Sequence, residues 1–246
     1  MSPVATTLVG ADEMTRRIRA VPAPVPVLDR ERERGLTDRQ REVLDQLGTM
    51  FDDGFAQITM AELAARLSCS LRTLYSLADS RDELVLMVVD RNLWRIGRAA
   101  RDAIDPGTAP LDALRAYLRA ATVAVSRATP AFTRDLEAVD AARQLWAGHN
   151  HYLFAVTRTL LDLAVEQGDI ADLDVAAVGR VVAGLGSDFS RPEVIPTLRS
   201  SPKDAADAVV DIVLRGLPPG PRRTGPAPGD ARTASTATST TTGEEP

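Results

Sequence analysis

Residues 58–75 indicate the architecture of this chain: Ile58-Thr59-Met60-Ala61-Glu62-Leu63-Ala64-Ala65-Arg66-Leu67-Ser68-Cys69-Ser70-Leu71-Arg72-Thr73-Leu74-Tyr75. Thr59 and Glu62 have the spacing of a capping box, in which hydroxyl and carboxylate each accept an N–H group at the start of a helix. Ser70 is a further helix-start signal. The spacing leaves room for a helix over 60–67, a tight turn at 68–69 and a helix over 71–78. Two short helices joined so tightly predict a helix-turn-helix, a device that presents one helix to DNA.

Two more capping-box patterns flank this stretch, Thr37-Asp38-Arg39-Gln40 before it and Ser80-Arg81-Asp82-Glu83 after it. With Phe51-Asp52-Asp53-Gly54-Phe55 and Thr73-Leu74-Tyr75, they give residues 37–84 a pattern that resembles the DNA-binding domain of TetR-family transcriptional regulators. The resemblance implies an all-α protein. It would have an N-terminal three-helix helix-turn-helix DNA-binding domain and a C-terminal helical ligand-binding and dimerisation domain.

The departures from the family pattern cluster in the turn and the recognition helix. Ser68 stands where the family usually has Gly, Leu71-Arg72 where it often has Lys-Gly, Leu77-Ala78 where an aromatic pair is usual, and Arg81 where Lys is usual. The operator sequence therefore does not follow from the family.

A recognition helix enters the major groove with its N-terminal residues against the base edges. Arg72 can form two hydrogen bonds with a guanine, and Tyr75 is placed to donate its hydroxyl to a phosphate. Leu71 in place of a cation removes one phosphate contact and predicts a shallower salt dependence. The residues expected at the DNA are Thr59, Ser70, Leu71, Arg72, Thr73, Tyr75, Ser76 and Arg81.

Composition fits a soluble helical protein but also supports a second interpretation. The chain is 44% hydrophobic and only 4% aromatic, with a net charge of −5 and a pI near 5.2. An acidic protein is not expected to bind nucleic acid non-specifically, because such binding depends on neutralising phosphates. The alternative to an operator-binding regulator is a helical dimeric interaction protein whose degenerate helix-turn-helix no longer binds DNA specifically.

The single cysteine, Cys69, excludes an intrachain disulfide and fits a reducing cytoplasm. It is expected to fill the corner of the helix-turn-helix, with a thiol redox sensor as the alternative. No run of about 18 apolar residues exists, so no membrane span is expected. The first residues do not have the layout of a signal peptide.

Four regions are expected along the chain: a disordered extension over 1–29, the DNA-binding domain over 30–84, the regulatory and dimerisation domain over 85–217, and a disordered tail over 218–246. Val21-Pro22-Ala23-Pro24-Val25-Pro26 forbids a helix and favours an extended rod. Arg16, Arg17 and Arg19 precede it, either as a solvated tail or as an arm that contacts DNA. The body helices are expected over 80–104, 111–129, 131–148, 149–168, 174–187 and 201–217.

The resemblance implies a small-molecule inducer bound among the body helices. Large side chains that could line its site are Tyr117, Phe132, Trp146 and Tyr152, and possible polar anchors are Arg115, Arg119, Arg143 and Asn150. The sequence does not identify the ligand.

The last two expected helices carry apolar stripes at helical spacing, with glycines beside the first stripe. The stripes can cover the core of one subunit, or pair with a second copy in a four-helix interface, as the family implies. A homodimer is expected, because a helix-turn-helix reads a site through two copies about 34 Å apart. The expected interface residues are Val178, Val182, Leu185, Val209 and Ile212.

Candidates for catalysis and metal binding are weak. The rings of His149 and His151 lie about 200° apart on a helix, on different faces, so they do not form a metal site. Asp52-Asp53 fits a solvated turn beside Gly54. We expect neither an enzyme nor a cofactor.

Overall fold

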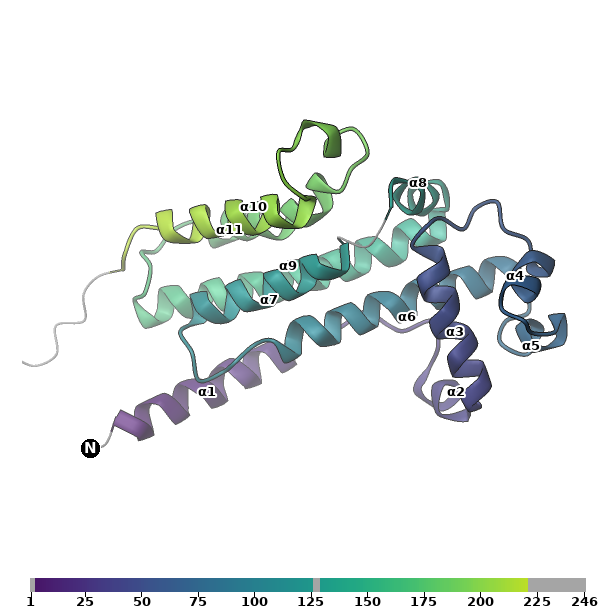
Figure 1. The fold of residues 1–246 in the computed structure, drawn as a ribbon. Coiled ribbons are helices and arrows are strands. Elements are labelled where there is room, and N and C mark those ends of the chain that lie inside the picture. The colour runs from purple at the N-terminus through teal and green to yellow at the C-terminus, as the bar shows by residue number, and fades with distance from the viewer. Residues whose placement is uncertain (1–2, 126–128, 221–246) are drawn as a thin grey trace, which may run out of the picture.

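The computed structural model describes residues 3–125 and 129–220, and within these ranges every regular element is helical. The head contains α2 (Arg30–Gly35), α3 (Asp38–Phe51), α4 (Met60–Arg66) and α5 (Leu71–Tyr75). The body contains α6 (Arg81–Asp102), α7 (Pro110–Val125), α8 (Pro130–Ala138), α9 (Asp140–Gln167), α10 (Val175–Phe189), a 3-10 turn η1 (Ile195–Thr197) and α11 (Pro202–Gly216). Helix α1 (Pro3–Ala20) lies along the body, while α2–α5 gather at the other end of α6 (Figure 1).

The helices of the head begin where the sequence predicts. Thr37 and Thr59 each form a complete capping box, with Gln40 and Glu62 respectively. Ser70 and Ser80 accept the N–H groups of Thr73 and Glu83. The box at Ser80 is only half formed, because the Glu83 carboxylate accepts from the N–H of Asp79 instead of that of the cap.

Two hydrophobic cores hold the molecule together. The first packs α3, α4 and α5 around the N-terminal half of α6, with Val43, Leu47, Leu63, Leu74, Leu84 and Met87 essentially inaccessible. The second lies among α1, α7, α9, α10 and α11 and includes Leu114, Tyr117, Val156, Leu160 and Val210. Both α6 and α9 contribute to both cores, so these helices connect the head to the body. Within the described residues, no helix is both long enough and apolar enough to cross a bilayer.

The loop between α3 and α4 is fixed by residues far away in the sequence. One Asp135 carboxylate oxygen, on α8, accepts the N–H groups of Phe55 at 2.5 Å and Ala56 at 2.7 Å. The ring of Phe55 meets that of Phe132 edge to face, with centroids 5.8 Å apart. Helix α8 therefore attaches the body to the head at this loop.

The N-terminal extension differs from the expected disorder. Residues up to Ala20 form α1, and its side chains Met14 and Ile18, one turn apart, are buried in the body core. The proline-rich segment that follows is extended, as predicted, and runs along α6 to the head (Figure 1). The prediction was wrong because it weighed the prolines and the local charges, whereas a complementary apolar surface on the body stabilises the helix.

Two boundaries in the body also differ. The break expected near Gly148 is absent, because α9 continues from Asp140 to Gln167 and the chain bends at Val139 instead. Gly148 is exposed, and its cost of about 1 kcal/mol in a helix is small beside the packing of α9 against neighbouring helices. At the C-terminus, the carbonyl of Pro218 accepts the N–H of Ala171 at 2.8 Å, so the ordered chain extends past 217. Most of the tail expected to be disordered, residues 221–246, lies outside the described residues.

Candidate functional site

The turn between α4 and α5 is built without the usual glycine. Ser68 adopts φ +49°, a left-handed conformation that costs a non-glycine residue energy. Arg39, on α3, donates to the carbonyl groups of Leu67 at 3.0 Å and Ser68 at 3.3 Å. These bonds satisfy carbonyls at the end of α4 and support the strained residue. Arg39 was not predicted at this site, because its acceptors lie 28 and 29 residues further along the chain.

Helix α5 is shorter than predicted and presents one face to solvent. Leu74 is fully buried and anchors the helix on the head, whereas Leu71 is 45% exposed and Tyr75 51% exposed. Arg72 is also exposed. Neither the Arg72 guanidinium nor the Tyr75 hydroxyl has a hydrogen-bond partner or ion pair among the described residues. Helix α5 thus exposes an apolar, a cationic and a phenolic side chain to solvent, while Leu74 packs its opposite face against the head.

The hydroxyl groups expected at the DNA are already engaged with the protein. Ser70 and Thr73 bond to each other at 2.9 Å. Ser76 donates to the carbonyl of Thr73 at 2.7 Å and accepts from Gln40 at 3.0 Å. Thr59 donates to the Glu62 carboxylate at 2.8 Å, and the hydrogen bonds from Thr59 lower the pKa of Glu62. These residues shape the surface, and any contact with DNA would have to compete with these bonds.

Arg81 does not lie free on this surface. Its guanidinium donates to the main-chain carbonyls of Ile58 and Ala56, each at 2.7 Å, and to that of Phe55. It also pairs with Asp82 at 2.9 Å. The placement of Arg81 among the DNA-contacting residues therefore needs correction: this side chain closes the loop between α3 and α4.

The body contains a cavity of about 260 Å³. It lies between α6, α7, α8 and α9, and all four predicted aromatic residues line it: Tyr117, Phe132, Trp146 and Tyr152. Leu93, Ile96 and Leu153 contribute further apolar surface. Burial raises the pKa of Tyr117, so its phenol stays neutral at physiological pH.

Of the four proposed polar anchors, only Asn150 lines the cavity. Arg115 and Arg119 instead pair with Asp211, each at 2.8 Å, and Arg143 pairs with Asp140 at 2.6 Å. Their assignment to the ligand site was wrong, because each had an acidic partner on its own or a neighbouring helix.

A buried polar pair borders the cavity. His149 lines the cavity, and its Nε2 lies 3.1 Å from the Asp90 carboxylate. The other oxygen of Asp90 accepts the N–H of Val27 at 2.8 Å, which holds the extended segment against α6. The ring of Trp94 meets His149 edge to face, with centroids 5.6 Å apart. His149 thus has a structural partner in Asp90, a contact that the sequence did not predict.

No family model matches this chain, and no curated protein matches it. Solved structures do. A TetR transcription regulator from Haloarcula marismortui has a TM-score of 0.63 at 16% identity, covering 74% of this chain and 99% of that one. The TetR-family regulator PfmR from Thermus thermophilus has a TM-score of 0.54 at 24% identity, covering 71% and 98%. A TetR-like regulator from Rhodococcus gives 0.54 at 22%, covering 72% and 96%. The chain has the TetR fold.

Within this TetR fold, α10 and α11 carry an apolar face that the single chain leaves uncovered. Ile212 is 68% exposed and Val181 53% exposed. Of the residues expected at a dimer interface, Val178, Leu185 and Val209 are half-buried. Val182 is only 2% exposed and belongs to the core of the single chain, so its placement at the interface is corrected.

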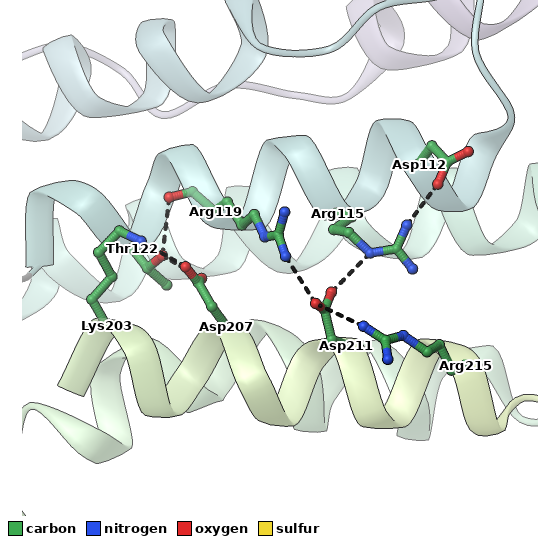
Figure 2. A network of polar contacts seen from close by, with 8 residues as sticks. All are labelled: Asp112, Arg115, Arg119, Thr122, Lys203, Asp207, Asp211 and Arg215. Carbon is green, nitrogen blue, oxygen red and sulfur yellow. Dashed lines mark hydrogen bonds and ion pairs between the residues drawn. The ribbon is translucent and has the colours of Figure 1, made fainter. Parts of the chain in front are cut away.

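Charged residues join α11 to α7 in this TetR fold (Figure 2). The Asp211 carboxylate accepts from Arg115 and Arg119, and Arg215 approaches it at 3.3 Å. One turn earlier on α11, Asp207 accepts from Lys203 at 2.6 Å and from Thr122 at 3.1 Å. This network joins α11 to α7 through Asp207 and Asp211, while Ile212 on the same helix remains 68% exposed.

Proposed function

We propose that this chain is a homodimeric transcriptional regulator that binds a DNA operator through α5. The observation that carries the proposal is the pair of exposed, unengaged polar side chains on α5, Arg72 and Tyr75, in a helix-turn-helix of a TetR fold. Arg72 has the geometry to recognise a guanine, and Tyr75 to donate to a phosphate. A second candidate is a helical interaction protein that has lost specific DNA binding; the exposed Leu71 and the net charge of −5 favour it.

We further propose that the uncovered face of α10 and α11 pairs with its copy in a second chain. These two helices carry the exposed Ile212 and Val181 and the half-buried Val178, Leu185 and Val209, and a two-fold axis can make such an apolar surface self-complementary. Pairing there places two heads on one operator, which raises affinity through the second binding site.

We propose that the cavity is the site through which a small molecule regulates DNA binding. Helix α6 begins at the cap next to α5, packs in the head core, and then lines the cavity through Leu93, Ile96 and Ala100. A small molecule that binds one arrangement of α6 better than another shifts the position of the heads. We propose that ligand binding lowers operator affinity, so that the protein acts as a repressor released by its effector.

The test starts with selection of binding sites from a random duplex library by the full chain at low salt, followed by mobility shifts on the selected sequence. Recovery of a two-fold repeat with a defined half-site spacing supports the regulator. A folded dimer that selects no sequence contradicts it and favours the interaction protein. Arg72→Ala is the control that separates binding through α5 from binding elsewhere.

A further inference from the structure

The cavity has room for a ligand somewhat larger than a benzene ring. Its volume is about 260 Å³, and an engineered apolar cavity of about 150 Å³ holds benzene. Its walls include the rings of Tyr117, Tyr152 and Trp146, with Leu153 and Ile96 between them. Aromatic walls favour a flat ring that meets them offset or edge to face. The shape of the site therefore suits one aromatic ring with a short side chain.

Most polar groups that line the cavity are already engaged. His149 bonds to Asp90, and the Asn92 side chain donates to the carbonyl of Gly48 at 3.2 Å. Asp52 is engaged as well, because its main-chain carbonyl accepts hydrogen bonds from both the hydroxyl and the N–H of Thr129. A ligand gains little from these groups, because it would have to break existing bonds.

Among the described residues that line the cavity, Arg95 supplies the guanidinium group. It is exposed on α6 and has no ion pair among the described residues. Its neighbours along the helix are occupied: Arg91 pairs with Glu33 and Asp45, and Arg101 lies over the ring of Tyr152. An exposed guanidinium beside an apolar cavity can pair with a carboxylate that stays partly hydrated, so the desolvation cost of the pair is small.

We infer that the cavity takes a small aromatic carboxylic acid, with its ring among Tyr117, Tyr152 and Trp146 and its carboxylate on Arg95. This inference rests on the proposed role of the cavity as an effector site and specifies the ligand's charge and shape. Asn150, which also lines the cavity, can donate a second hydrogen bond.

Three probes of nearly equal size separate charge from shape: 3-phenylpropionate, 3-phenylpropanol and 3-phenylpropylamine. Binding to the full chain is followed by quenching of tryptophan fluorescence, since Trp146 lines the cavity, and by titration calorimetry. The acid is expected to bind roughly 1.5- to fivefold more tightly than the alcohol, the range for an exposed charge pair, and the amine most weakly.

Arg95→Gln should bring the affinity for the acid down to that for the alcohol and leave the alcohol unchanged. Arg98→Gln is the matched control, because Arg98 is an exposed arginine on the same helix that does not line the cavity. Equal affinities for acid, alcohol and amine would overturn the inference. So would an unchanged affinity for the acid in Arg95→Gln, or calorimetry that detects no binding of any probe.

Mobility shifts with and without 3-phenylpropionate separate this inference from the proposed function. Selective, Arg95-dependent acid binding by a chain that shifts no DNA would support the ligand class and contradict the regulator. Specific DNA binding by a chain that shows no preference for the acid would overturn the ligand class and leave the regulator in place.

Discussion

The guanidinium of Arg81 contacts three main-chain carbonyl groups in the loop before α4, those of Phe55, Ala56 and Ile58. Arg81→Ala would leave these acceptors without a charged donor. We expect a loss of about 2–3 kcal/mol in the free energy of unfolding, measured by urea denaturation. Arg81→Lys should recover only part of it, because an ammonium lacks the planar fork.

The control for that change is Arg66→Ala, an exposed arginine on α4 with no ion pair among the described residues. It should change stability by less than about 0.5 kcal/mol. Equal losses of unfolding free energy in the two variants would mean that Arg81 contributes only its positive charge and not its bonds to the loop carbonyls.

Arg72 and Tyr75 should differ in what they do to DNA recognition. Arg72→Ala is expected to cost about 1–3 kcal/mol on the selected operator and to relax the preference at one base position in each half-site. Tyr75→Phe should weaken binding to all sequences by a similar factor, because phosphates carry no sequence information.

Competition binding against single-base operator variants distinguishes the two patterns. Equal weakening on every variant after Arg72→Ala would make Arg72 a phosphate contact. The base-reading role would then fall to Leu71 or to the methyl group of Thr73, since the hydroxyl groups of Thr73 and Ser76 already have partners in the protein.

At the scale of a helix, the link between α7 and α11 depends on the ionisation of Asp211. Burial alone raises the pKa of Asp211, but the hydrogen bond from Arg115 and the nearby charges of Arg119 and Arg215 outweigh it and lower the pKa overall. A carboxylate with a lowered folded-state pKa stabilises the fold at pH values above its unfolded pKa. That contribution is lost as the pH falls through the folded value.

Asp211→Asn should therefore lower the free energy of unfolding by about 1 kcal/mol at pH 7. The difference from the wild type should shrink as the pH falls below about 4. Urea denaturation across this range checks it, with Asp188→Asn, an exposed carboxylate on α10, as the control. A difference that is constant with pH would show that shape, and not charge, is what the substitution removes.

Local signals predicted the starts of helices well, and tertiary contacts decided the rest. The caps at Thr37, Thr59 and Ser70 form as expected, because a cap joins residues three apart. Helix α1 and the continuity of α9 depend on surfaces far away in the chain, so the sequence around them indicated otherwise. The four aromatic residues of the cavity were found because large side chains are few in this chain. The bonds from Arg81 to the loop carbonyls and from Arg115 to Asp211 join residues far apart in the sequence, so local spacing could not predict them.

At the scale of the whole molecule, two substitutions on the C-terminal helices should separate assembly from folding. Ile212→Glu places a charge on the exposed face and should give a folded monomer with greatly reduced operator affinity. Val182→Glu buries a charge in the core of the single chain and should unfold it, at a cost of several kcal/mol.

Light scattering after size exclusion gives the assembly state, and circular dichroism gives the fold. An Ile212→Glu variant that keeps the mass of the wild-type dimer would remove this face from the interface. A folded Val182→Glu monomer would mean instead that Val182 belongs to the interface after all.

The docking of α1 has a consequence for the order of events during synthesis. Arg17 on α1 pairs with Glu166, which is 149 residues further along the chain. At about 5–20 residues per second, a ribosome takes roughly 7–30 s to cover that distance. During this interval Met14 and Ile18 lack the α9 part of the core that buries them, while the head already has most of its own residues. Helix α1 is thus synthesised long before the helix that it packs against, and the interval before α9 emerges is when a chaperone has the most to protect.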